Sequence, residues 1–203
     1  TFAKNKQVID NLERLGGLKD FEKIDICKSE KTQYYRNKLE FTFSNSRWLT
    51  NEEIATGQEF DRNALGFHVP KRFDKIVDIE HCYLQDEPSN EIRNEIRRYA
   101  LENNLPFFDI KNKEGLLRTM VVRTSNIGQV MLIIQFFENN TEEIEKLLNH
   151  LKTKFPSITS LNYVHNPKGN DTFNDLEVVC FHGTDYIEEK LEVNVIEFET
   201  HKN

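Results

Sequence analysis

The sequence has few cysteines and no long apolar segment. Its cysteines, Cys27, Cys82 and Cys180, number three and lie far apart, which excludes the disulfide framework of a small secreted domain. No apolar run approaches the roughly 20 residues that span a bilayer, and no signal-type segment opens the chain. We therefore expect a cytoplasmic protein with no membrane partner.

Glycine-rich phosphate-binding turns are also absent. The eight glycines are scattered, and neither G-x-x-x-x-G-K-[ST] nor G-x-G-x-x-G occurs. A nucleotide or S-adenosylmethionine pocket in a doubly wound sheet needs such a turn at the C-terminal end of a strand. The sequence therefore predicts that this chain holds no cofactor and carries no complete catalytic apparatus of its own.

The chain has no excess of positive charge either. Its 203 residues carry a net charge of −7, whereas nucleic-acid-binding domains are usually basic. Any role with RNA must therefore rest on cations that are concentrated locally. The 37% of hydrophobic residues, with 15 Phe among them, indicates a folded globular chain rather than a disordered one.

What the sequence does contain is a succession of strand and helix patterns. Residues 1–15 predict an amphipathic helix that ends at Gly16-Gly17. Residues 35–43 alternate as a strand, with Leu39, Phe41 and Phe43 on one face. We predict an α+β fold, with a mainly antiparallel sheet and helices packed on one face. The further elements expected are strands at 64–69, 75–79, 116–125, 129–137, 158–165, 176–182 and 186–198, and helices at 88–102 and from the cap Asn140 to Phe155, with a polar connection at 44–63.

This order suggests two parts, a linker helix at 1–20 and a central α+β domain at 30–203. Neither a cap nor an initiator Met precedes the first helix, and the last strand pattern reaches the end of the chain without a terminating signal. We expect both ends to be boundaries within a larger protein.

Two short patterns bring a cysteine close to a histidine: Asp78-x-x-His81-Cys82 and Cys180-x-His182. Zinc takes four ligands, usually in closely spaced pairs. Cys180 and His182 would share one face of a strand and could form half of such a site. A buried cysteine beside a surface histidine is the simpler interpretation. A Cys–His nucleophile pair would need a third group to orient it, and none is evident at either place.

Cations interleaved with aromatic residues are the main candidate for binding. Single-stranded RNA stacks its bases on aromatic rings and places its phosphates on cations. Composition alone favours a merely solvated sheet face. Strand spacing places two of the cations, Arg118 and Arg123, on opposite faces. The candidate RNA-binding residues are Arg36, Lys38, Lys71, Arg72, Arg118, Arg123 and Lys168.

Several stretches, in order and spacing, resemble the central domain of the bacterial RNA (uracil-5-)-methyltransferase family, which forms 5-methyluridine. The resemblance covers essentially the whole chain, although no single motif is decisive. The matching stretches are residues 35–41 (YRNKLEF), 65–67 (LGF), 76–82 (IVDIEHC), 117–118 (LR), 122–123 (VR) and 186–189 (YIEE).

The resemblance implies that catalysis occurs elsewhere. In that family an oligonucleotide-binding domain and a cysteine cluster precede this region, and a Rossmann-type methyltransferase domain with S-adenosylmethionine follows it. The helix at 1–20 would dock on that methyltransferase domain or, without it, pair with a second copy as an artefactual dimer. Cys82 matches the fourth [4Fe–4S] ligand of the ribosomal-RNA branch. The other three ligands would lie outside this chain, so we expect no cluster here.

The leading hypothesis is thus an RNA-facing, interdomain module of a 23S rRNA (uracil-5-)-methyltransferase that is inactive alone. The same module of a tRNA (uracil-5-)-methyltransferase is the first alternative. A non-enzymatic protein-interaction domain, whose acidic surface binds a basic partner, is the second.

Overall fold

The computed structural model describes residues 2–191 of the chain. It divides into two units that meet between Tyr35 and Arg36, slightly beyond the expected start of the central domain at residue 30. Whether the first unit docks on another domain stays a prediction.

The first unit holds the expected N-terminal helix. It consists of α1 (Phe2–Asp10), continued by a π-helical turn, η1 (Asn11–Leu15). Gly16 donates its N–H to the carbonyl of Asn11 at 3.0 Å, and Gly17 takes a φ of 67°, which favours glycine. No residue of α1 or η1 is buried: Phe2, Val8, Leu12 and Leu15 are exposed, and Ile9 is half-buried.

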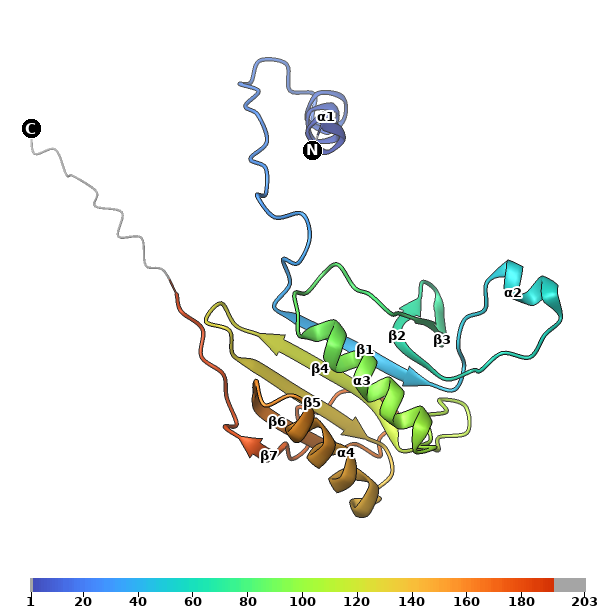
Figure 1. Cartoon of the computed structure of the whole chain (residues 1–203). Coiled ribbons are helices and arrows are strands. Elements are labelled where there is room, and N and C mark those ends of the chain that lie inside the picture. The colour runs from blue at the N-terminus through green and yellow to red at the C-terminus, as the bar shows by residue number, and fades with distance from the viewer. Residues whose placement is uncertain (1, 192–203) are drawn as a thin grey trace, which may run out of the picture. The chain divides into compact units, whose positions relative to one another are not determined.

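The second unit carries the sheet and the remaining helices (Figure 1). Its helices are α2 (Asn51–Thr56), α3 (Ser89–Glu102) and α4 (Thr141–Lys154). Its strands are β1 (Lys38–Ser44), β2 (Ala64–Val69), β3 (Arg72–Asp78), β4 (Leu117–Thr124), β5 (Val130–Phe136), β6 (Ile158–His165) and β7 (Val179–Gly183).

The sheet is mainly antiparallel, as expected, but it is mixed because one pair of strands is parallel. The seven strands lie in the order β3-β2-β1-β4-β5-β6-β7, and β5 pairs with β6 in parallel while every other neighbouring pair is antiparallel. The connection from β5 to β6 runs through α4, and such a helical crossover returns the chain in the same direction.

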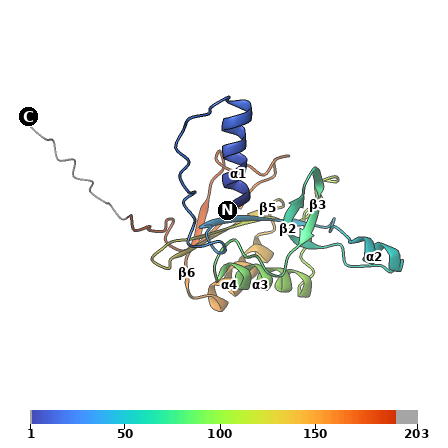
Figure 2. The ribbon, with the colours of Figure 1, turned by 90° about the horizontal axis from the view of Figure 1, so that it is seen from above.

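Both α3 and α4 pack on the same face of this sheet, as expected (Figure 2). The alternation of β1 directs Leu39, Phe41 and Phe43 into the core beneath these helices. Each helix contributes one apolar stripe at helical spacing. These stripes are Ile92, Ile96 and Ala100 on α3, and Ile144, Leu147, Leu148 and Leu151 on α4.

The opposite side of the sheet, named here the loop face, has a different cover. Residues of the β6–β7 connection, Phe173 and Leu176, pack there on Val121, Ile133 and Val164. The β2–β3 hairpin also rises from the sheet on this side (Figure 2). The β2–β3 hairpin and the β6–β7 connection therefore flank the loop face, and strands β1 and β4 lie between them in the sheet.

A few elements differ from their expected bounds. The predicted connection at 44–63 contains α2, whose capping box between Thr50 and Glu53 was the available sequence signal. The strand expected at 176–182 begins at Val179. Residues 186–191 form no strand, and the rest of the strand expected at 186–198 lies outside the described residues.

No helix within residues 2–191 is long and apolar enough to cross a membrane.

A carboxylate links the two large helices. Glu95 on α3 lies 2.6 Å from Nε2 of His150 on α4 and 2.6 Å from Nη2 of Arg98. The hydrogen bonds from Arg98 and then from His150 hold the pKa of Glu95 down at about 2, although burial opposes them. Because this pKa is depressed, the stabilisation is present above the ordinary value of 4.5 and is lost as the pH falls through about 2.

Replacement of Glu95 with Gln should lower the free energy of unfolding by about 1–2 kcal/mol at pH 7, since it removes charge-assisted hydrogen bonds. Urea denaturation at several pH values measures this effect, and the difference from wild type should shrink between about pH 4.5 and 2. Glu145→Gln, at an exposed position on α4, is the matched control. An equal effect of both substitutions would contradict the proposed link.

Candidate nucleic-acid interface

Two predicted cations meet on the loop face. Lys38 of β1 lies directly opposite Arg123 of β4 in the antiparallel register. Both side chains are exposed, and neither has a hydrogen bond or ion pair with any residue among 2–191. Like charges opposed across two strands destabilise a sheet. A bound anion such as a phosphate would relieve this repulsion.

Two carboxylates border this pair. One groove is lined by Lys38 and Arg123 together with Glu40 and Asp171, and the loop residue Phe173 also lines it. Burial raises the pKa of Glu40, and the charge of Asp171 raises it further, while Lys38 opposes both. The raised pKa means that Glu40 takes up a proton at a higher pH than an ordinary glutamate does, and this proton makes the groove more positive.

The β2–β3 turn presents two more of the predicted cations. Lys71 takes a φ of 65° in this tight turn, and both Lys71 and Arg72 are exposed. The adjacent Phe73 is also exposed, to 71%. Neither cation has a side-chain partner in the part of the chain that the structure describes.

Arg36 lies just before β1. Its backbone N–H donates to the carbonyl of Leu84 at 2.9 Å, whereas its side chain is exposed and unpaired among the described residues. Arg36 is therefore also free to meet a phosphate.

Arg118 is placed differently from the expectation. A bulge in β4, where Leu117 pairs with Phe136 and Thr119 with Gln135, makes Arg118 the extra residue. Arg118 and Thr119 consequently line the same cavity on the loop face, and Asp171 lines both this cavity and the groove of Arg123. The predicted placement of Arg118 and Arg123 on opposite faces is therefore wrong.

The Arg118 side chain is only 3% exposed and holds the β6–β7 loop. Its Nη1 donates to the carbonyls of Asn166 and Lys168, at 2.9 and 2.6 Å, and its guanidinium lies 4.8 Å from the ring centroid of Phe108. Burial lowers the pKa of Arg118 from its ordinary value. Lys168, in the same loop, pairs with Asp175. Two of the predicted cations thus hold the loop, and the other five face solvent.

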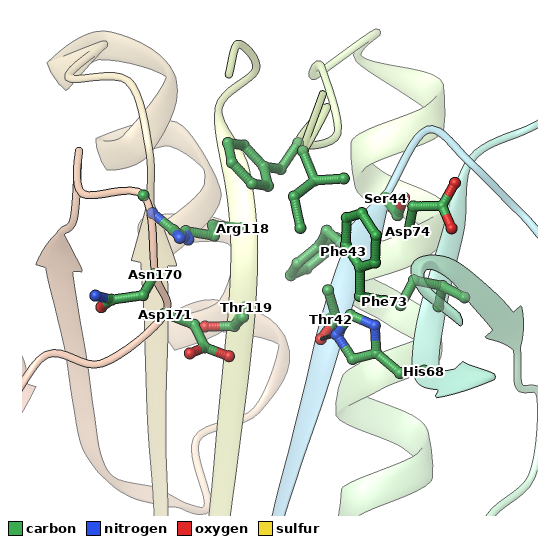
Figure 3. Close-up of a pocket in the computed structure, with 14 residues that line it drawn as sticks. Thr42, Phe43, Ser44, His68, Phe73, Asp74, Arg118, Thr119, Asn170 and Asp171 are labelled. Atoms are coloured by element: carbon green, nitrogen blue, oxygen red, sulfur yellow. Dashed lines mark hydrogen bonds between the residues drawn. The ribbon is translucent and has the colours of Figure 1, made fainter. Parts of the chain in front are cut away.

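A cavity that the sequence did not reveal lies between the hairpin and the loop, over β1 and β4 (Figure 3). Its volume is about 170 Å³. The His68 ring contacts the Thr42 hydroxyl at 3.3 Å on the hairpin side. Alternation along β1 and β4 could have placed Thr42 and Thr119 on one face. It could not have revealed the walls of the cavity, which come from the hairpin and the loop. The lining residues used below are Phe73, Phe108, Ile110, Arg118, Thr119 and Asp171.

Cys82 is buried at 6% exposure, and its backbone is held by Asn90. The Asn90 side chain accepts from the Cys82 N–H at 2.7 Å and donates to its carbonyl at 3.3 Å. A [4Fe–4S] cluster takes four thiolates, and the chain has three cysteines. The residues present therefore do not fit such a cluster within this chain.

Cys180 and His182 lie on β7, where both are exposed. The Cys180 thiol contacts the carbonyls of His182 and Gly183, at 3.8 and 3.7 Å. Within residues 2–191, no group of three or more His, Cys, Asp or Glu side chains is arranged to hold a metal ion.

Comparisons with known proteins find relatives that are described as RNA methyltransferases. It is 48% identical, over 94% of its length, to an uncharacterised RNA methyltransferase of Porphyromonas gingivalis. Over 93% of its length it is 48% identical to one of Bacteroides thetaiotaomicron and 33% identical to one of Chlorobaculum tepidum. The chain is therefore similar in sequence to part of each of these proteins. It spans 42%, 42% and 40% of these relatives' lengths.

A solved structure shares the fold. The Pyrococcus abyssi tRNA (uracil-54, C5)-methyltransferase, solved in complex with S-adenosyl-L-homocysteine, matches 80% of the chain with a TM-score of 0.56 and 23% identity. The match covers 35% of that enzyme. No family model matches the chain.

Replacement of Arg118 with Met should lower the free energy of unfolding by about 1–3 kcal/mol, because two loop carbonyls lose their donor. The amides of residues 166–175 should also exchange hydrogen faster. Urea denaturation and hydrogen exchange measure these effects. Arg123→Met on the same strand is the control, because the exposed Arg123 has no internal partner among residues 2–191. Unchanged loop exchange in the Arg118 variant would contradict the assignment.

Proposed function

We propose that this chain is the RNA-facing and interdomain module of an S-adenosylmethionine-dependent RNA (uracil-5-)-methyltransferase that acts on 23S rRNA. The module holds a single-stranded segment while the target base is flipped into a catalytic domain outside this chain. The observation that carries the proposal is the opposed, unpaired cation pair of Lys38 and Arg123 on the loop face.

The remaining free cations support the same role. Lys71 and Arg72 occupy the tip of the hairpin that rises on the loop face, and Arg36 precedes β1 (Figure 2). Phosphate contacts by such residues position a strand without reading its bases. Local concentration of these cations reconciles RNA binding with the net charge of −7.

The choice of RNA rests on different evidence. Cys82 matches the ribosomal-RNA branch, which supports 23S rRNA. The tRNA alternative is supported by the solved fold neighbour, a tRNA (uracil-54, C5)-methyltransferase. The net charge of −7 supports the remaining alternative, a domain that binds a basic protein.

The other parts of the proposal concern the intact protein. The oligonucleotide-binding and methyltransferase domains would be the partners of this module, and α1 would dock on the latter. Cys82 would be the fourth [4Fe–4S] ligand only where three further cysteines are supplied from outside this chain. Pairing of two copies through α1 would be an artefact of the isolated chain.

Simultaneous replacement of Lys38 and Arg123 with Ala should weaken binding of single-stranded RNA to a similar degree for all sequences. Loss of two phosphate contacts should flatten the slope of log K against log salt by about 1.4, at about 0.7 per contact. Fluorescence anisotropy across a salt series measures both quantities. The control removes the same charge from α4 by Lys152→Ala with Lys154→Ala. Equal salt slopes for the two double variants would contradict the proposal.

The 203-residue chain should show no saturable binding of S-adenosylmethionine and no methyl transfer to RNA, because it lacks a glycine-rich turn at a strand end. Isothermal calorimetry and a radiolabelled methyl-transfer assay measure the two activities. Micromolar affinity for the cofactor would place part of its binding site in this chain and contradict the proposed division of labour.

A further inference from the structure

The cavity on the loop face contains a buried hydroxyl without a partner. Thr119 is 1% exposed, and its Oγ1 has no hydrogen bond within residues 2–191. Its cross-strand neighbour Gln135 is buried too, and its Nε2 is likewise unpaired among those residues. Buried polar side chains in native proteins nearly always have a partner. Because Thr119 lines the cavity, a group that enters it can hydrogen-bond to this hydroxyl.

Further polar groups converge on the same space. The Nη1 group of Arg118 donates to two loop carbonyls, whereas its Nε and Nη2 have no partner in the described part of the chain. The Asp171 carboxylate, which only accepts, lies on the same side of β4 as the Thr119 hydroxyl (Figure 3). The cavity therefore offers donors from Arg118, an acceptor from Asp171, and a hydroxyl that can serve as either.

The size and the apolar walls suit a single aromatic ring. The cavity measures about 170 Å³, and an apolar cavity of about 150 Å³ in another protein accommodates benzene. Phe108 and Ile110 supply apolar walls. Phe73 lines the same cavity and is 71% exposed, a position where a ring can stack on a base that enters.

Cations lie next to this entrance. Phe73 follows directly on Lys71 and Arg72, which are exposed and unpaired within the described residues. A nucleotide whose base enters the cavity would thus have phosphate-binding groups close to its backbone.

We propose that this cavity binds one pyrimidine base of single-stranded RNA, distinct from the base that is methylated. The inference rests on the proposed RNA-binding function. Uracil presents two carbonyl oxygens on either side of an N–H, which match donors from Arg118 and Thr119 around the Asp171 acceptor. Cytosine offers an amino donor to Asp171 and two acceptors to the other groups. Adenine presents no carbonyl oxygen, so it cannot offer the two carbonyl acceptors that uracil offers to Arg118 and Thr119.

The test compares binding of the 203-residue chain to oligouridine and oligoadenosine of eight nucleotides, followed by fluorescence anisotropy at one salt concentration. Wild type should prefer oligouridine. Phe73→Ala should weaken oligouridine binding by about tenfold through loss of stacking, and Thr119→Val by about fivefold through loss of a hydrogen bond. Binding of oligoadenosine should change little in either variant.

Matched controls lie outside the cavity. Tyr186→Ala removes an aromatic ring that is 57% exposed, and Thr153→Val removes a hydroxyl from α4. Neither control should alter the preference for oligouridine. The Thr119→Val variant could misfold, because Thr119 is buried. The Phe73→Ala variant therefore tests the base site independently, because Phe73 is exposed. Amide NMR shifts at Thr119 and Asp171 on addition of uridine monophosphate, but not ribose 5-phosphate, would further support base binding.

The outcomes separate this inference from the proposed function. If Lys38→Ala with Arg123→Ala weakens both oligonucleotides while Phe73→Ala and Thr119→Val leave the preference intact, the cavity is not a base site and the module still binds RNA. If the cavity variants abolish the uridine monophosphate shifts while the cation variants have no effect on RNA binding, the base site stands and the proposed function fails. No shifts and no preference would overturn the cavity inference.

Discussion

Burial of the Arg118 guanidinium is the interaction on which the loop face depends. The side chain lies over Phe108 and donates to the carbonyls of Asn166 and Lys168, which holds the β6–β7 loop beside β4. That loop in turn supplies Asp171 to both the cavity and the groove of Lys38 and Arg123. A cation that the sequence suggests for RNA binding is therefore a structural residue of the loop face.

One-sided packing determines where a partner can bind the second unit. Because α3 and α4 cover one face of the sheet, the large apolar side chains of β1 and most of those of β4 and β5 point toward these helices. The other face has only a small apolar cluster beneath the β6–β7 loop. It can therefore carry Lys38, Thr42, Thr119 and Arg123 without disturbing the main core. The main apolar core and the exposed cations therefore lie on opposite sides of one sheet.

The elements with strong periodicity were predictable. The strand at 158–165 has the expected bounds, and α3 buries Ile92, Ile96 and Ala100 as its spacing indicates. The parallel pairing of β5 with β6 was missed, because a local pattern reports strand and helix but not the direction in which a crossover returns. Helix α2 was missed although Thr50 and Glu53 form a capping box, since its six residues have no buried stripe to reveal it.

By itself, the sequence determined the α+β class, the helix ended by Gly16-Gly17, the inward face of β1 and the set of candidate cations. These depend on local backbone preference and on spacing along one chain segment. Only the tertiary structure decided which cations are free. Arg118 and Lys168 bond to residues of the β6–β7 loop, whereas Lys38 meets Arg123 across two strands distant in sequence. Such pairings depend on sheet register and on one bulge, and neither leaves a periodic signal in the sequence.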